Sequence, residues 1–210
     1  MKKYTIKETF GPTIQGEGGM SGIPCHFLRF SGCNMWDGLQ AHKAASACPY
    51  CDTDFRGGDK LSADEILWRL QLLDGKIEWV TLSGGEPLLQ VDAALIRVLS
   101  ECYKLAVETN GTIARPTNKW FDHVTLSPKV PFAELKLKRC DTLKVLYPHP
   151  DPQITPEAYA SVVATYRCLQ PVDTGDAQST QANIAATVAK LYELPGWRLS
   201  LQIHKYIGVK

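Results

Sequence analysis

Three cysteines of this chain have a spacing suited to binding a metal centre. Cys33, Cys48 and Cys51 form a C-x14-C-x2-C array, in which Cys48 and Cys51 share one tight turn. The long segment between Cys33 and Cys48 can loop out, because loop-closure entropy grows slowly with length. A structural zinc site would need a fourth ligand such as His26 or His42, whereas a 4Fe-4S cluster held by three cysteines keeps one iron open. Spacing alone leaves zinc and iron-sulfur as equal alternatives.

Four polar segments lie where predicted strands end, and their side chains could contact a ligand. They are Ser83–Pro87, Glu108–Gly111, Ser127–Lys129 and Gln170–Asp173. In barrels and in open α/β sheets, ligands bind at the carboxyl ends of the parallel strands. Because the cysteine array also follows a predicted strand, we expect the metal centre to share one edge of the sheet with a binding site of several parts.

The elements that must position these segments alternate between strands and helices. The apolar segments of strand length are Tyr4–Phe10, Cys25–Phe30, Ile77–Leu82, Lys104–Glu108, His123–Leu126, Thr142–Leu146, Arg167–Gln170 and Arg198–Ile203. Ser62 and Glu65 predict the capped start of one helix, Asp92 begins a second, and the apolar spacing over 184–192 indicates a third. No G-x-G-x-x-G follows the first strand, and we expect an α/β fold, a partial (β/α) barrel with fewer than eight βα units, rather than a Rossmann sheet.

Length and composition indicate a single compact domain, residues 1–210, with a small-molecule partner. Lys plus Arg (23) and Asp plus Glu (22) give a net charge of +1, so no global field favours nucleic acid or a membrane surface. Neither a membrane span nor a signal peptide is evident in the sequence, and we expect a cytoplasmic protein. In that compartment, the seven cysteines indicate metal ligands and core thiols rather than disulfides.

The array and its neighbours resemble the radical S-adenosylmethionine (SAM) superfamily. The shared features are three cysteines near the N-terminus, Tyr50 directly before the last of them, and Gly84–Pro87 after a strand. The spacing is longer than the usual C-x3-C-x2-C. An expanded cluster loop, about 31–58, together with Cys51-Asp-Thr53 and the preceding Thr13–Gly18, resembles the 7-carboxy-7-deazaguanine synthase family. Further motifs that match that family are Phe27–Cys33, Glu108–Asn110, Ser127–Lys129, Leu143–Val145, Gln170–Pro171 and Leu201–Lys205.

The resemblance implies a radical SAM lyase that uses three cofactors. Cys33, Cys48 and Cys51 would hold a 4Fe-4S cluster, whose open iron binds SAM, and Thr53 would bind Mg²⁺. The SAM contacts implied by the family are Tyr50, Gly85, Glu86, Glu108, Ser127, Lys129, Gln170 and Asp173. The implied reaction is the conversion of 6-carboxy-5,6,7,8-tetrahydropterin to 7-carboxy-7-deazaguanine with loss of ammonia, a step of 7-deazapurine (queuosine-type) biosynthesis.

The residues that the resemblance assigns to the pterin have suitable chemistry. They are Ile14, Gln15, Gly16, Glu17, Arg29, Ser83, His204 and Lys210. Glu17 can accept hydrogen bonds from the amino and ring N–H groups of the guanine-like edge, and the planar fork of Arg29 can pair with the carboxylate. An Arg in an apolar strand also needs an anion, because an unpaired buried charge is costly.

The family resemblance further implies an electron donor such as flavodoxin or ferredoxin, and a homodimer. We expect the other cysteines (Cys25, Cys102, Cys140 and Cys168) to be buried thiols, and His123 and His149 to face solvent. Trp36, His42 and Lys43 belong to the inserted loop, where a surface or dimer-contact role is expected. Two alternatives remain: a zinc-stabilised binding module, and another radical SAM enzyme such as a glycyl-radical activase.

Overall fold

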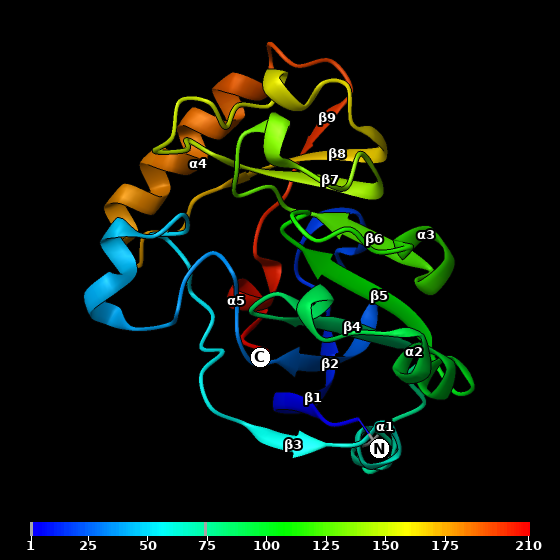
Figure 1. The fold of residues 1–210 in the computed structure, drawn as a ribbon. Coiled ribbons are helices and arrows are strands. Elements are labelled where there is room, and N and C mark those ends of the chain that lie inside the picture. The colour runs from blue at the N-terminus through cyan, green and yellow to red at the C-terminus, as the bar shows by residue number, and fades with distance from the viewer. Residues whose placement is uncertain (1, 74) are drawn as a thin grey trace.

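A single twisted β-sheet organises the chain. The computed structural model describes residues 2–73 and 75–210, and in this part the sheet has nine strands in the order β3-β1-β2-β4-β5-β6-β7-β8-β9. Figure 1 shows the sheet curving from β3 at the bottom to β9 at the top. The strands are β1 (Tyr4–Ile14), β2 (Pro24–Phe30), β3 (Asp59–Leu61), β4 (Trp79–Gly84), β5 (Lys104–Thr109), β6 (His123–Leu126), β7 (Arg139–Tyr147), β8 (Val163–Pro171) and β9 (Trp197–Leu199).

Most neighbouring strands run parallel, as the alternation of strands and helices predicts. From β2 through β4 to β9, each neighbouring pair is parallel, whereas β1 is antiparallel to both β2 and β3. The first two predicted strands therefore do not form a βα unit. The interval between Ile14 and Pro24 lacks the helical crossover that a parallel connection needs, so the chain returns antiparallel.

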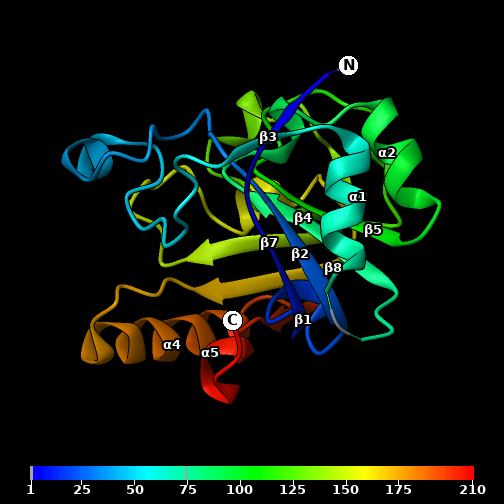
Figure 2. The ribbon, with the colours of Figure 1, turned by 90° about the horizontal axis from the view of Figure 1, so that it is seen from below.

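Five α-helices lie in the described part of the chain: α1 (Ala63–Gln71), α2 (Ala93–Ser100), α3 (Thr117–Trp120), α4 (Ala177–Leu191) and α5 (Ile203–Ile207). Figure 2 shows α1 and α2 side by side, while α4 runs beside β8. No helix of the described residues is long and apolar enough to cross a membrane.

Local capping signals determine where the first two long helices begin. Ser62 Oγ accepts from the backbone N–H of Glu65, and the Glu65 carboxylate accepts from the backbone N–H of Ser62, which is the predicted capping box. Asp92 caps α2 by accepting from the backbone N–H groups of Ala94 and Leu95. Both predicted helix starts are confirmed.

Three sequence-based expectations are wrong. Residues 198–203 do not form one strand, because β9 ends at Leu199 and α5 begins at Ile203. Cys102 is exposed, because it follows the end of α2, whereas the other three expected core thiols are buried. His123 does not face solvent but is buried within β6, where its ring contacts Thr142 Oγ1 at 3.0 Å.

The core sits between the sheet and the helices that follow its strands. Leu82, Leu105 and Leu143 are fully buried on three of the parallel strands, in one cluster with Leu95 and Leu99 of α2. Burying such side chains contributes about 1.5–3 kcal/mol each. This packing fixes the parallel strands, so the residues at their carboxyl ends project from a rigid base.

Candidate functional site

One cavity of about 480 Å³ lies at the carboxyl ends of the parallel strands. Its size falls within the range of small-molecule sites. The predicted site residues that line it are Ile14, Gln15, Gly16, Glu17, Arg29, Cys33, Cys48, Tyr50, Cys51, Thr53, Ser83, Gly85, Glu108, Ser127, Lys129, Gln170, Asp173, His204 and Lys210. The fold therefore brings nearly all of them together, although they come from opposite ends of the chain.

The three cysteines of the array face this cavity as free thiols. Cys48 and Cys51 share a turn in which the Cys51 backbone N–H donates to the Cys48 carbonyl at 3.1 Å. The hydrogen bond with Cys48 lowers the pKa of the Cys51 thiol to about 7, and the same bond, with burial, raises the pKa of Cys48. A thiol with a pKa near 7 forms a thiolate readily, and the thiolate is the form that binds metal.

The donor set of the cavity fits a three-cysteine 4Fe-4S cluster. Among the described residues, no fourth cysteine lines the cavity, and neither does His26 or His42. His26 is buried beside Tyr103, and His42 pairs with Asp37 at 2.5 Å on the exposed loop. In residues 2–73 and 75–210, no three His, Cys, Asp or Glu side chains are gathered around a single-ion site. Three thiols without a fourth would leave one iron of a cluster open.

The glycine-rich turn after β4 packs directly on the start of the cluster loop. The Gly85 N–H donates to the Phe30 carbonyl at 3.1 Å and the Glu86 N–H donates to the Gly32 carbonyl at 2.9 Å. A Cβ on Gly85 would lie 1.9 Å from the Gly32 oxygen, so only glycine allows this approach. The turn thereby fixes the backbone next to Cys33.

Glu86 is the one predicted SAM contact that does not line the cavity. It is fully buried, and its carboxylate accepts from the Leu88 N–H at 3.0 Å, the Thr109 hydroxyl at 2.8 Å and the Asn110 N–H at 2.8 Å. Burial raises the pKa of Glu86 to about 7. Its observed role is to join the turn after β4 to the end of β5, because all these partners belong to the protein.

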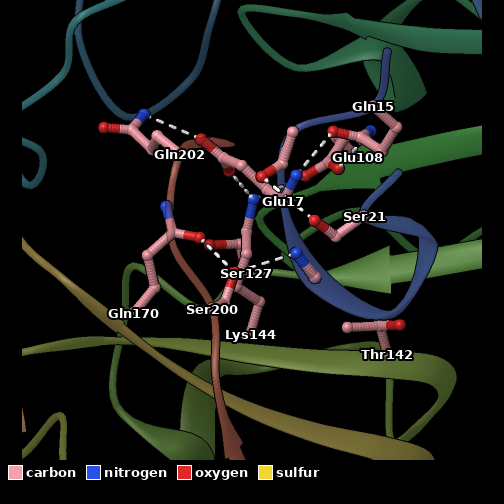
Figure 3. A network of polar contacts seen from close by, with 12 residues as sticks. Gln15, Glu17, Ser21, Glu108, Ser127, Thr142, Lys144, Gln170, Ser200 and Gln202 are labelled. Carbon is pink, nitrogen blue, oxygen red and sulfur yellow. Dashed lines mark hydrogen bonds and ion pairs between the residues drawn. The ribbon is translucent and has the colours of Figure 1, made fainter. Parts of the chain in front are cut away.

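A buried lysine joins two acidic residues on the cavity wall. The Lys144 ammonium, on β7, contacts Glu17 Oε2 and lies 2.9 Å from Glu108 Oε2, and its side chain is only 6% exposed. Gln202 donates to the other oxygen of Glu17 at 2.7 Å, and Gln15 donates to the other oxygen of Glu108 at 3.2 Å. Figure 3 shows these five side chains in one connected polar network, with Gln202 and Gln15 at its two ends. The wall of the cavity is thus polar, charged and almost closed to water.

Arg29 lines an aromatic part of the cavity, beside Phe10. Its Nε is 3.1 Å from Glu8 Oε1, an ion pair whose angle is not that of a hydrogen bond. The guanidinium also lies 5.5 Å from the centre of the Phe10 ring, and the Lys210 ammonium reaches both that ring and Glu8. Two cations therefore share one carboxylate, which leaves positive charge facing the cavity.

The C-terminal segment closes one side of the cavity by polar contacts with the cluster loop. Lys205 of α5 pairs with Asp173 at 2.5 Å and with Asp52 at 3.3 Å. Gln202 also donates to Asp52 at 3.2 Å, and the Ile203 N–H donates to the Gly16 carbonyl at 3.0 Å. These contacts connect the C-terminal segment to Asp173, a predicted SAM contact, and to Gly16, a predicted pterin contact.

The remaining predicted residues make smaller contacts along the wall. Lys129 donates to Ser127 Oγ at 2.7 Å, and burial lowers its pKa. Tyr50 contacts the ring of His149 through its hydroxyl, so His149 is half-buried rather than solvent-facing. Gln170 accepts from the Ser200 hydroxyl at 2.8 Å.

Sequence reasoning gave no role to several residues of this wall, among them Lys144, Gln202, Lys205 and Asp52, or to Glu8, the partner of Arg29. Lys144 carried a usable signal, because a lysine inside an apolar strand is rarely buried without a partner. The two partners of Lys144 lie 127 and 36 residues away in the sequence. That separation hides the pairing from any local pattern.

Three thiols around one cavity, at the carboxyl ends of a mostly parallel sheet, are the arrangement expected of a radical SAM enzyme. No protein-family model matches the chain. The chain does match curated relatives over nearly its full length. The 7-carboxy-7-deazaguanine synthase of Bordetella pertussis is 39% identical, with 98% of this chain and 99% of the relative covered. That of Nitratidesulfovibrio vulgaris is 40% identical with the same coverage, and that of Bradyrhizobium diazoefficiens is 38% identical over 99% of both chains.

The chain belongs to the 7-carboxy-7-deazaguanine synthase family, as its motifs indicate. Among solved structures it is similar to QueE from Escherichia coli, with a TM-score of 0.64 and 22% identity, covering 95% of this chain and 93% of that one. That likeness supports the α/β fold with its mostly parallel sheet. Family membership rules out the zinc-stabilised module and the glycyl-radical activase as descriptions of this chain.

Proposed function

We propose that the cavity converts 6-carboxy-5,6,7,8-tetrahydropterin to 7-carboxy-7-deazaguanine and ammonia, the step in queuosine-type biosynthesis for which the family is named. The observation that carries this proposal is the joint placement of three thiols, the Glu17 carboxylate and the Arg29 guanidinium around one cavity. These are the groups needed for a cluster, a guanine-like edge and a substrate carboxylate.

Cys33, Cys48 and Cys51 would bind the 4Fe-4S cluster. When bound, the cluster supplies the electron that cleaves SAM and so starts radical chemistry on the pterin. The protein fixes the first thiol through the glycine-rich turn after β4 and the other two through their shared turn. Cys48 is buried and the other two thiols are partly buried, and bound ligands would exclude further water, which protects a reactive site from side reactions.

SAM would lie beside the thiols, along the ends of β4 to β8. Gly85 would allow its methionyl part to approach the backbone, while Ser127, Lys129, Gln170 and Asp173 would contact the rest of the molecule. Tyr50 would flank the adenine. Glu108 is shared between this side and the pterin side, because Lys144 connects it to Glu17. We leave Glu86 out of this set, since its carboxylate is used within the protein.

The pterin would occupy the space between Glu17 and Arg29. Gln15 and Glu17 would accept from its guanine-like edge, with the backbone of Ile14 and Gly16 beside them. The Arg29 fork would hold its carboxylate on the aromatic side. Ser83, His204 and Lys210 would close over the ring. One end of the substrate would then contact a negative charge and the other end a positive charge, which sets the orientation of the substrate.

Thr53 would contribute an oxygen ligand to Mg²⁺, with substrate and water in the other positions. Thr53 lines the cavity two residues after Cys51, which supports a metal ion placed between cluster and substrate.

The sheet order supports a partial (β/α) barrel built as one domain over residues 1–210, with the cluster loop at about 31–58. We also propose a cytoplasmic homodimer that takes its electrons from a flavodoxin or ferredoxin.

Anaerobic reconstitution with iron and sulfide, followed by incubation with SAM, a reductant and the pterin, tests the proposal. We expect a brown protein with about four irons per chain, release of ammonia, and a product lighter than the substrate by one ammonia. A colourless protein that retains one zinc, or a full cluster without turnover of this pterin, would contradict it.

A further inference from the structure

The Lys144 ammonium is the point where three elements of the cavity wall meet. Lys144 lies on β7, Glu108 lies near the end of β5, and Glu17 lies between β1 and β2. The ammonium bridges one oxygen of each carboxylate, as Figure 3 shows. The exposed fractions of the three side chains are 6%, 16% and 18% for Lys144, Glu17 and Glu108. Water therefore screens this charged triad only weakly.

Two neighbouring carboxylates in a buried site cannot both stay ionised without a cation. Burial acts to raise the pKa of Glu17, but the charge of Lys144 and hydrogen bonds from Lys144 and Gln202 lower it to about 2. Burial acts to lower the pKa of Lys144, but Glu108 and Glu17 raise it. Glu17 and Lys144 are thus both ionised in the neutral range.

Each carboxylate keeps acceptor capacity for a ligand. Glu17 accepts from Lys144 and Gln202, and Glu108 accepts from Lys144 and Gln15, so neither carboxylate uses all four of its lone pairs. At its amino group and the neighbouring ring nitrogen, a guanine-like edge presents N–H donors and no acceptor. An ionised carboxylate matches these donors, whereas a protonated carboxyl group would oppose them with its own O–H.

We propose that Lys144 is a positioning residue for the pterin: it holds Glu17 and Glu108 as ionised acceptors facing the guanine-like edge of the substrate. This inference rests on the proposed function and adds to it the residue that sets the charge state of the binding edge. Lys144 itself acts through the two carboxylates.

Other titratable groups act on the triad from the elements packed around it. They are Lys129 after β6, His123 on β6, Cys25 on β2 and Cys168 on β8. Burial lowers the pKa of His123 and raises those of Cys25 and Cys168, so these three stay neutral around pH 7.5. Burial also lowers the pKa of Lys129. All four are present in every variant below, and the Lys144→Arg control keeps the charge that acts on Lys129 and Cys168.

The experiment compares wild type with Lys144→Met, which removes the charge but keeps the length of the side chain. The reconstituted holoenzyme is titrated anaerobically, without reductant, with 6-carboxy-5,6,7,8-tetrahydropterin at pH 6.5, 7.5 and 8.5. Without Lys144, one carboxylate should bind a proton with a pKa near 8, as buried glutamates do (about 8–9 in documented cases). The variant-to-wild-type ratio of dissociation constants should then rise about 25-fold from pH 8.5 to pH 6.5, the change in ionised fraction for such a group.

Two further variants serve as controls. Lys144→Arg keeps the charge and should restore a ratio that does not change with pH. Lys104→Met removes an exposed lysine of β5 that pairs with Glu78 outside the cavity, and its ratio should stay near one. If Lys144→Met does not fold, Lys144→Gln removes the charge but keeps a hydrogen-bond donor beside both carboxylates, and it should show the same pH dependence.

A ratio that is constant from pH 6.5 to 8.5 in whichever of Lys144→Met and Lys144→Gln folds would overturn the role of Lys144, whatever the size of the ratio. A merely structural loss is not expected to follow the charge of the carboxylates. A wild type that neither binds nor converts the pterin would instead overturn the proposed function, and the inference with it.

Discussion

Replacing Arg29 with Ala should weaken pterin binding strongly and leave the fold nearly intact. The Arg29 side chain is 20% exposed, so solvent screens its charge little. Losing the partner of a buried carboxylate costs on the order of 2–5 kcal/mol. At about 1.4 kcal/mol per tenfold change, the affinity for the pterin should fall by roughly 30-fold to several thousand-fold. The fold should tolerate the change because Glu8 keeps the Lys210 ammonium as a partner.

The assay is equilibrium titration of the anaerobic holoenzyme with the pterin and with an analogue that lacks the 6-carboxylate. The analogue should bind wild type and Arg29→Ala about equally, and SAM binding should change little. Arg29→Lys, which keeps the charge but loses the planar fork, should give an intermediate affinity. If the analogue distinguishes the two proteins as strongly as the true substrate does, Arg29 supports the structure of the site rather than the substrate carboxylate.

Three other substitutions test separate parts of the site. Cys48→Ala should abolish iron retention and turnover, whereas Cys102→Ala, on an exposed thiol, should keep both when iron and product are measured. Glu86→Gln should lower the free energy of unfolding by about 1–3 kcal/mol, since an amide NH₂ cannot accept from the Asn110 N–H. Because burial raises the pKa of Glu86 to about 7, its ionisation costs wild type stability as pH rises from about 4.5 to 7. Urea titration should show that Glu86→Gln lacks this dependence. Thr53→Ala should remove the stimulation of turnover by Mg²⁺, and equal stimulation in both proteins would contradict a ligand role.

Local signals in the sequence were sufficient for much of the scaffold. The starts of α1 and α2 were predictable because Ser62, Glu65 and Asp92 contact backbone groups only two or three residues away. The parallel strands were predictable from apolar segments alternating with helices. The polar segments at their carboxyl ends follow from the same pattern, since parallel strands present those ends at one edge.

Contacts between distant segments were not predictable. Lys144 contacts carboxylates from two other parts of the chain. Glu8 of β1 pairs with Arg29 of β2 and with Lys210, which lies 202 residues further along the sequence than Glu8. Glu86 illustrates the same limit: the motif indicated a ligand contact, but its acceptors are used by backbone and side-chain donors of residues 88, 109 and 110. Sequence patterns place residues at an edge of the sheet, and only packing determines which of them face the cavity.

Main-chain hydrogen bonds of Gly32 hold the start of the cluster loop. The Gly32 N–H donates to the Phe55 carbonyl at 3.1 Å, and the Gly32 carbonyl accepts from the Glu86 N–H at 2.9 Å. Gly32 thus connects the beginning of the loop to its end and to the turn after β4, without using the side chains between Cys33 and Cys48. The length and composition of that interval can therefore diverge during evolution while the first thiol keeps its place. For the same reason, it is a suitable point for inserting a reporter peptide or a docking module into an enzyme of this family.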